Sequence, residues 1–215
     1  MDQQLLFLIN HTWTHPALDR VMAVASSFDF WWPFLLVLGV VAAIFGGFRW
    51  RAFLLAVGLA VGITDALVVD TLKSVVGRAR PNDALEGVRS LDLANVSPRF
   101  LAVAQPLRQK YSVARISSPG GNSFPSGHAA NNFAVAAVSV VFFRRWGWLV
   151  LLPAVLVSYS RVYVGSHWPL DVVASALIGS GIGVLTATVL EAIWRRWGQK
   201  WVPTLHERHP SLLNA

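Results

Sequence analysis

Three clusters of polar residues have the types and spacing needed to bind an anion and to carry out nucleophilic chemistry on it. The first contains Lys73 and Arg80, seven residues apart, with Pro81 directly after them. If a helix continues that far, two turns separate the cations and both can face one anion. Pro81 disfavours helical backbone at Arg80 and turns the chain. Taken alone, the pair is more typical of a basic anchor at a membrane edge.

The second cluster is the tetrapeptide Pro125, Ser126, Gly127 and His128. A helix that begins here points free backbone N–H groups and the positive end of its dipole toward an anion. Gly127 would let that anion approach the backbone closely, and Ser126 can cap the helix or donate to a phosphate oxygen. By itself the tetrapeptide is also an ordinary helix start.

The third cluster runs from Ser160 and Arg161 to His167 and Asp171. Pro169 is typical of the first turn of a helix, so we expect His167 at the helix start and Asp171 one turn further on. A carboxylate at that spacing can hold the imidazole by one ring nitrogen and leave the other nitrogen free to attack. A solvated His–Asp pair is the alternative interpretation.

The composition indicates that a membrane-embedded bundle carries these clusters. Hydrophobic residues make up 54% of the 215 residues and charged residues 13%, about half the charged fraction of a soluble domain. Membrane-spanning helices need about 20 residues, and five apolar blocks approach or exceed that length. The five predicted spans are 30–48, 52–72, 128–143, 148–163 and 168–193.

We therefore predict an all-α, polytopic transmembrane bundle of five or six spans, organised as a single domain over residues 1–215. Residues 1–29 are predicted to form an interfacial helix or a short additional span. Residues 30–193 form the transmembrane core, and 194–215 form a cytoplasmic tail. The first residues lack the basic segment and cleavage site of a signal peptide, so we interpret them as mature protein. The absence of cysteine excludes disulfides and thiolate metal ligands.

The basic residues predict the orientation of the bundle. Short clusters follow the first, third and fifth predicted spans, and they contain Arg49, Arg51, Arg144, Arg145, Arg195, Arg196 and Lys200. All lie on one side, which the positive-inside rule assigns to the cytoplasm. The long polar loop 73–127 and the turn 160–168 then lie outside, so the three clusters meet at the outer rim. The net charge of +7 follows this pattern rather than one polar face, which argues against nucleic-acid binding.

The three clusters together resemble the signature of the phosphatidic acid phosphatase type 2 superfamily, which is shared with the vanadium haloperoxidases. The motifs K-x6-RP, PSGH and SR-x5-H-x3-D are complete and in order at positions 73–81, 125–128 and 160–171. The resemblance covers about residues 52–193. The apolar spans favour the membrane lipid phosphatase branch over the soluble haloperoxidase branch.

This resemblance implies a role for each motif residue. His167 would attack phosphorus to form a phosphohistidine, with Asp171 orienting its ring. His128 would protonate the leaving oxygen and later activate water. Phosphoryl oxygens would be bound by Lys73, Arg80, Ser126, Gly127 and Arg161. Three fixed cations can stabilise a metaphosphate-like transition state, and no carboxylate cluster suggests a metal cage, so we predict a metal-independent hydrolase without a cofactor.

Acidic residues inside the predicted spans need a separate interpretation because they are costly there. Asp65 is expected to hydrogen-bond a neighbouring helix, and Asp70 to pair with Lys73 three residues on. Glu191 is expected to be interfacial. A transporter is the rival interpretation of these acids, but paired half-repeats with polar residues at mid-bilayer are not apparent. An inactive lipid-binding scaffold is disfavoured by the complete motifs.

The expected substrate is a lipid phosphate or diphosphate lying among membrane lipids. By resemblance to bacterial relatives, undecaprenyl diphosphate is the first choice, and the predicted location is the inner membrane with the site on the periplasmic or extracellular face. Phosphatidylglycerophosphate, phosphatidic acid and a lipid A phosphate remain alternatives. The choice depends on the loop 82–124 and on a lateral groove, and the sequence indicates no protein partner.

Overall fold

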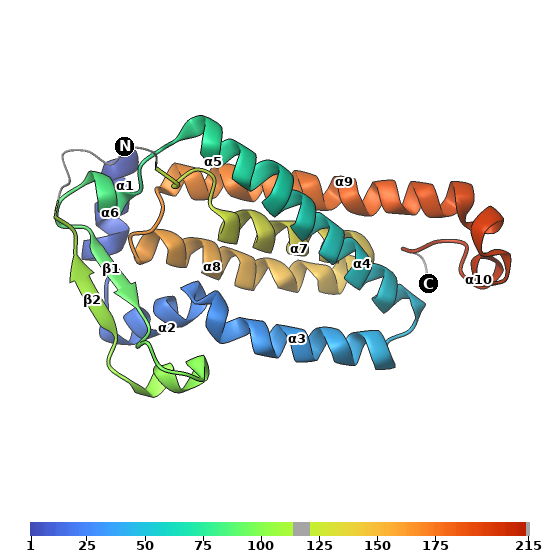
Figure 1. Cartoon of the computed structure of the whole chain (residues 1–215), viewed down its shortest axis with the longest axis horizontal. Coiled ribbons are helices and arrows are strands. Elements are labelled where there is room, and N and C mark those ends of the chain that lie inside the picture. The colour runs from blue at the N-terminus through green and yellow to red at the C-terminus, as the bar shows by residue number, and fades with distance from the viewer. Residues whose placement is uncertain (114–120, 214–215) are drawn as a thin grey trace.

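The computed structural model describes residues 1–113 and 121–213, and Figure 1 shows them as an elongated bundle of helices that run side by side along one axis. The long helices are α3 (Phe28–Phe45), α4 (Phe48–Ile63), α7 (Gly127–Gly147), α8 (Leu151–Tyr163) and α9 (Pro169–Trp201). The short helices are α1 (Asp2–Phe7), α2 (Pro16–Ser26), α5 (Asp70–Val76), α6 (Pro81–Ala84) and α10 (Pro203–Arg208). Shorter helical turns cover Leu8–Thr12, Thr64–Val69, Arg99–Ala104 and Trp148–Val150. The all-α prediction is confirmed.

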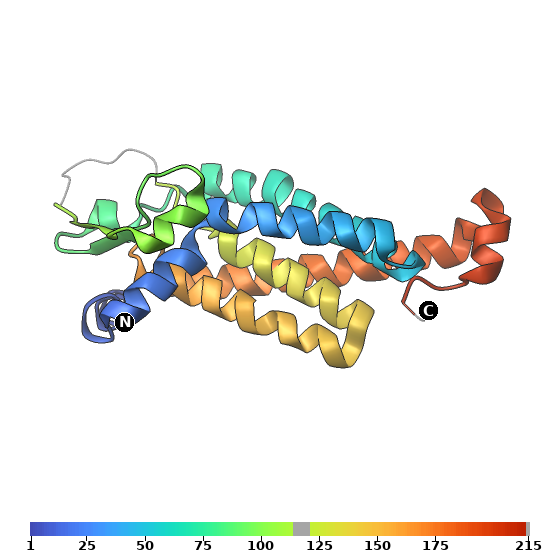
Figure 2. The same ribbon diagram turned by 90° about the horizontal axis from the view of Figure 1, so that it is seen from below.

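Four helical stretches of the described chain are long and apolar enough to cross a membrane: Phe28–Phe45, Phe48–Ala84, Gly127–Tyr163 and Pro169–Trp201. The third stretch is not straight. Arg144 has a positive φ of 42°, and the chain folds back there, so that α7 and α8 form an antiparallel hairpin (Figure 2). The chain is therefore an integral membrane protein, and five or six spans remains a prediction.

The second predicted span is part of a longer helical path. It begins at Phe48, passes through the π-helical turn Thr64–Val69 and ends at Val76. Gly77 follows in the left-handed region with φ of 57°, a conformation that costs glycine little. The helix therefore ends at Val76, four positions before Arg80, so the condition under which Lys73 and Arg80 would share one helical face is not met.

Small residues bring α7 and α9 into close contact. A Cβ atom added to Gly179 would lie 2.0 Å from the Ala130 carbonyl oxygen, and one added to Gly183 would lie 2.4 Å from that of Ala134. Such stripes let helix backbones approach in a membrane, where lipid-facing side chains provide no hydrophobic drive for association. Helix α3 contributes little to this core, since none of its residues is buried.

The basic clusters lie at one end of the bundle. The ring centroids of Trp50 and Phe143 are 4.6 Å apart, and those of Phe48 and Trp194 are 5.3 Å apart. These aromatic residues are sequence neighbours of the three basic clusters, so the clusters lie close together in the fold. The opposite end carries α1, α2, α6 and a small sheet (Figure 1). The basic clusters and the motif residues therefore lie at opposite ends of the bundle, as predicted.

The predicted long loop contains regular structure. Strands β1 (Arg89–Asp92) and β2 (Arg108–Tyr111) pair antiparallel, with Arg89 opposite Tyr111 and Asp92 opposite Arg108. Two four-residue strands rich in charged residues lack the apolar alternation that indicates a strand, which is why the sequence did not reveal them. Residues 114–120 of this loop lie outside the described residues.

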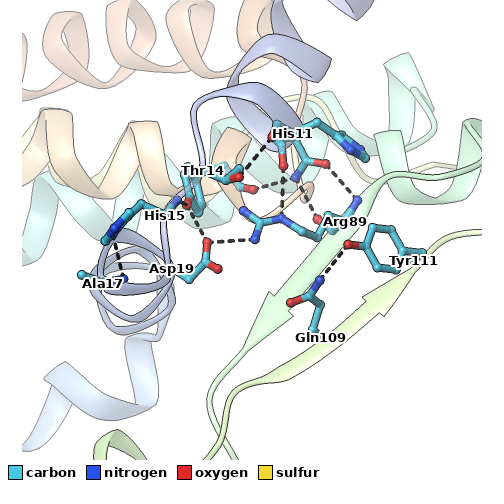
Figure 3. Close-up of polar contacts among 10 residues, drawn as sticks. His11, Thr14, His15, Ala17, Asp19, Arg89, Gln109 and Tyr111 are labelled. Atoms are coloured by element: carbon cyan, nitrogen blue, oxygen red, sulfur yellow. Dashed lines mark hydrogen bonds and ion pairs between the residues drawn. The ribbon is translucent and has the colours of Figure 1, made fainter.

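The N-terminal segment folds as short helices against the end of the bundle that carries β1. The Asn10 side chain donates to the carbonyl oxygens of Arg89 (2.8 Å) and Tyr163 (2.6 Å). Asp19 accepts from the Tyr163 hydroxyl at 2.5 Å and pairs with Arg89 at 2.8 Å. Figure 3 shows His11, Thr14, His15 and Asp19 around the Arg89 side chain, beside Gln109 and Tyr111 of β2.

The C-terminal residues fold back onto α9 and cover Glu191, whose position at the membrane interface stays a prediction. Its carboxylate is 7% exposed and accepts from the Ser211 hydroxyl at 2.6 Å and the Leu212 backbone N–H at 2.7 Å, while also pairing with Arg195. Leu212 is buried in the same apolar cluster as Phe142. These donors explain how a carboxylate can be buried near the helix end.

Candidate active site

Three stretches far apart in the sequence are joined by hydrogen bonds at the end that carries β1. The backbone N–H of Ser123 donates to the Arg78 carbonyl at 2.9 Å, and that of Gly121 donates to Gly77 at 3.2 Å. The indole of Trp168 donates to the Ala79 carbonyl at 2.8 Å. The chain between Lys73 and Pro81 is therefore held between residues 121–123, just before the PSGH tetrapeptide, and the start of α9.

The predicted cations surround the two predicted catalytic histidines. Lys73, Arg80 and Arg161 all lie near enough for their charges to act on His128. Arg80, Arg161 and His128 in turn act on the His167 ring. The structure thus brings both imidazoles and all three cations into one site, although they come from α5, the segment before α6, α7, α8 and the turn before α9.

Several buried donors in this site have no partner within the described residues. They are the Ser126 hydroxyl, Nε of Arg80 and Nε of Arg161. Unpaired buried donors are costly in a folded protein, so each needs an explanation such as a ligand. All three belong to residues predicted to bind phosphoryl oxygens. Their chemistry fits an oxyanion with several acceptor oxygens.

Gly127 begins α7 beside these donors. A Cβ atom built on it would lie 3.6 Å from Val69 and 3.7 Å from the Asp65 carboxylate, both ordinary contacts. The protein's own packing therefore does not require glycine here. The helix start carries free backbone N–H groups, and a residue without a side chain leaves them accessible to an anion.

His167 is 3% exposed and lies in the turn between α8 and α9. Gly165 makes that turn with φ of 74°, close to the Arg89 carbonyl. Burial, followed by the charge of Arg161, lowers the pKa of His167 to about 3. The ring is therefore neutral near pH 7, as a nitrogen nucleophile must be.

The predicted direct hold of Asp171 on His167 is not what the structure contains. Nδ1 of His167 lies 2.6 Å from the Ser123 carbonyl oxygen. The Asp171 carboxylate instead accepts from the Ser123 hydroxyl at 2.5 Å and pairs with Arg78. Asp171 lies in the first turn of α9, one turn after His167 as predicted, but its carboxylate faces these two donors.

Arg80 follows the prediction for a residue before proline. Its backbone is extended, with φ of −70° and ψ of 154°, and Pro81 begins α6. The side chain reaches the site from this extended segment rather than from a helix.

The two acidic residues of the second span behave differently. Asp65 accepts from the Asn131 amide of α7 at 2.9 Å, which confirms the expected interhelical hydrogen bond. The ion pairs found over residues 1–113 and 121–213 do not include Asp70 with Lys73, so that expected pairing is wrong.

Sequence reasoning missed four residues that contact the site residues. Ser175 accepts from the Ser126 backbone N–H at 2.8 Å, and its position one turn after Asp171 on α9 could have indicated it. Arg78 lies between two motif cations and could have been weighed with them. Ser123 and Asp2 carry no sequence signal, because their roles depend on contacts between distant segments.

A metal centre was not predicted. Across the described ranges, 1–113 and 121–213, no group of three or more His, Cys, Asp or Glu side chains is placed to hold a metal ion.

The comparisons with known proteins agree with the motifs and the geometry. The PAP2 superfamily profile matches residues 49–195, which is more than half of the chain and includes every motif residue. The chain belongs to the PAP2 superfamily. The predicted family is confirmed.

Several curated relatives of the chain are named as phosphatases of lipid A or of undecaprenyl diphosphate. A lipid A 4'-phosphatase of Bacteroides thetaiotaomicron is 28% identical over 83% of this chain and 72% of that protein. An undecaprenyl-diphosphatase of Sulfolobus acidocaldarius is 47% identical over a shorter match, 33% of this chain and 35% of that protein. The crystal structure of Aquifex aeolicus LpxE is similar with a TM-score of 0.60 and 26% identity, covering 86% of this chain and 94% of that one. These relatives place the PAP2 chain among membrane lipid phosphatases.

Proposed function

We propose that this PAP2 protein hydrolyses undecaprenyl diphosphate to undecaprenyl phosphate through a phosphohistidine on His167. One observation carries the proposal: the buried, unpartnered donors of Ser126, Arg80 and Arg161 lie beside the buried imidazole of His167 and the partly buried imidazole of His128. A terminal phosphate offers the acceptor oxygens that these donors lack. Positive charge held in place is also what transfer through a metaphosphate-like transition state needs.

In the first half-reaction, Nε2 of neutral His167 attacks the terminal phosphorus. The bond between that phosphorus and the bridging oxygen breaks, and His128 donates a proton to the leaving oxygen of the lipid phosphate. Lys73, Arg80 and Arg161, with the Ser126 hydroxyl and the Gly127 amide, bind the three remaining oxygens. Such donors act most strongly in a site from which water is excluded.

In the second half-reaction, water attacks the phosphohistidine. His128, now neutral, accepts a proton from that water, the P–N bond breaks, and inorganic phosphate leaves. His167 returns to its neutral form and His128 to its protonated form, so the cycle balances without an added group. His128 therefore acts as the general acid in the first half-reaction and as the general base in the second.

The proposed location is a bacterial inner membrane with the site on the periplasmic or extracellular face. The basic clusters at the opposite end of the bundle support this orientation because basic loops stay in the cytoplasm. Fusing a reporter active only outside the cytoplasm to a loop beside the site tests it, and activity only from fusions at the other end would reverse the orientation.

Purified protein in detergent should release phosphate from undecaprenyl diphosphate, and His167→Ala should abolish this release. A His167→Ala variant as active as the parent would remove the proposed nucleophile. Radiolabelled terminal phosphate should also appear on the acid-denatured parent protein when reactions are stopped early, provided that the acid exposure is brief because phosphohistidine is acid-labile. Activity should survive chelation, and a loss reversed by an added divalent metal would contradict metal independence.

A lipid A phosphate is the second candidate, favoured by the extended match to the Bacteroides relative, which covers most of both chains. Assaying lipid A, phosphatidylglycerophosphate and phosphatidic acid beside undecaprenyl diphosphate at equal surface concentration separates the candidates. A kcat/KM for lipid A at least tenfold above that for undecaprenyl diphosphate would reverse our order of preference.

A further inference from the structure

We propose that Asp171 positions the nucleophile indirectly, through Ser123, and that Arg78 and Asp2 lock Asp171 in place. This inference rests on the proposed role of His167. It assigns positioning roles to Ser123, Arg78 and Asp2, two of which lie outside the three motifs and one of which precedes the residues matched by the family profile.

The Ser123 carbonyl sets the tautomer of His167. A carbonyl oxygen only accepts hydrogen bonds, so Nδ1 of the neutral ring, 2.6 Å away, must carry the proton. Nε2 then keeps its lone pair and can attack phosphorus. A ring free to change tautomer would place its lone pair on the wrong nitrogen part of the time.

Two bonds set where that carbonyl points. The Ser123 backbone N–H donates to the Arg78 carbonyl at 2.9 Å, and its hydroxyl donates to Asp171 at 2.5 Å. Ser123, His167 and Asp171 are respectively 0%, 3% and 1% exposed. Hydrogen bonds are stronger in such surroundings, and a lost partner costs more.

Arg78 connects this buried unit to the N-terminal helix. Its guanidinium pairs with Asp171 and, at 2.6 Å, with Asp2 of α1. It also lies over the Trp168 ring, 4.9 Å from the centroid. The other oxygen of Asp2 accepts from the Leu170 backbone N–H at 3.1 Å. Asp2 therefore ties Arg78 to the first turn of α9, the turn that carries Asp171.

The arrangement differs in a testable way from a carboxylate bonded directly to the ring. If Asp171 acts through Ser123, removing the Ser123 hydroxyl disconnects it while leaving the carbonyl present. If Asp171 acts directly, the hydroxyl is dispensable. Arg78→Lys keeps the charge but cannot pair with both carboxylates in the fixed fork of a guanidinium.

The experiment measures steady-state phosphate release by Ser123→Ala, Asp171→Asn and the double variant, with Ser139→Ala as the matched control. Ser139 is also buried and donates to a carbonyl of its own helix, Val135, on α7. We expect Ser123→Ala to lower kcat roughly 10- to 100-fold with little change in KM, because small displacements of a reacting group have effects of that size. The double variant should be no slower than Asp171→Asn alone, and Ser139→Ala should match the parent.

Nitrogen-15 NMR of histidine-labelled protein gives a second readout that a loss of stability would not imitate. His167 of the parent should show one tautomer, with the proton on Nδ1, and Ser123→Ala should show a mixture. Arg78→Gln should lower kcat by a similar factor, with Arg78→Lys recovering part of it, and Asp2→Asn should have a smaller effect of less than about tenfold.

The proposal would be overturned if the kcat of Ser123→Ala were within twofold of the parent value and its His167 still showed a single tautomer. The same holds if the effects of Ser123→Ala and Asp171→Asn multiply, because independent actions multiply. Full activity of His167→Ala would instead contradict the proposed function itself.

Discussion

The close contact between α7 and α9 at Gly179 provides a sharp test of how packing supports the site. A Cβ atom at Gly179 would lie 2.0 Å from the Ala130 carbonyl oxygen, and Ala130 is two residues after His128 on α7. Gly181, two residues further along the same helix α9, has no atom within 4 Å of such a Cβ. Alanine at these two positions therefore makes the same chemical change in opposite surroundings.

The magnitudes follow from the contact distance. Carbon and oxygen atoms normally meet at about 3.3 Å or more, so Gly179→Ala must push α7 and α9 apart by about 1 Å. Overpacking of this kind costs about 1–3 kcal/mol. Gly181→Ala meets no such contact and gains the helix preference of alanine, up to about 1 kcal/mol. Gly179→Ala gains the same helix preference, so the two variants should differ by the cost of overpacking, about 1–3 kcal/mol.

The assay is thermal unfolding in detergent, followed by the fluorescence of the ten tryptophans, together with phosphate release at a temperature where both variants are folded. We expect Gly179→Ala to melt well below the parent and to lose activity by roughly a hundredfold, because α7 carries His128 and a displacement of 1 Å has that effect. Gly181→Ala should match the parent or melt slightly higher. Equal melting temperatures for the two variants would refute the argument that this contact sets the spacing of the helices.

Three further predictions concern single residues. The pKa of His167, lowered by burial and by Arg161 to about 3, means that its ring stays neutral as pH falls from 8 to 5; an NMR titration in which it protonates near pH 6.5 would contradict this. Arg161→Lys removes the donor Nε and should lower kcat by roughly 10²–10³, the usual effect of deleting one transition-state donor, and a change below threefold would exclude Arg161 from phosphate binding. Glu191→Ala leaves the Ser211 hydroxyl and the Leu212 N–H without their acceptor and should cost about 1–3 kcal/mol, while phosphate release at low temperature is unchanged because the site lies at the other end of the bundle.

The parts of the fold that follow from apolar blocks were predictable, because lipid contact and span length constrain them strongly. The positions of the long helices agree with the predicted spans, and the basic clusters meet at one end. What the blocks could not reveal is irregular structure inside them, such as the π-helical turn at Asp65 or the stop at Gly77. Both features depend on contacts with distant parts of the chain. Asn131 of α7 hydrogen-bonds Asp65 in the π-helical turn, and the Gly121 backbone N–H bonds the Gly77 carbonyl at the end of the helix.

The motif residues were predictable as a set, because two histidines and three cations at fixed spacings are rare unless they serve one site. The hydrogen bonds among these residues could not be predicted from the sequence. The spacing of His167 and Asp171 allows a direct hydrogen bond, and only the position of Ser123 shows that the carboxylate faces a hydroxyl instead. Ser123 lies 44 residues before His167, and it links the two residues through its carbonyl oxygen and its hydroxyl.

The N-terminal segment lies outside the residues matched by the family profile but contacts two arginines at the candidate site. Residues before position 49 lie outside the family match, yet Asp2 reaches Arg78, and Ser26 accepts from Arg161 through its carbonyl at 3.2 Å. Arg78 is held between Asp2 and Asp171, while Arg161, whose charge is opposed by that of Arg80, is the arginine proposed to bind phosphate. A cation that binds a phosphate stabilises the transition state only if it does not have to move. Acceptors in α1 and α2 contact these two guanidinium groups. We therefore expect short helices that carry no motif to support the proposed chemistry by limiting the movement of Arg78 and Arg161.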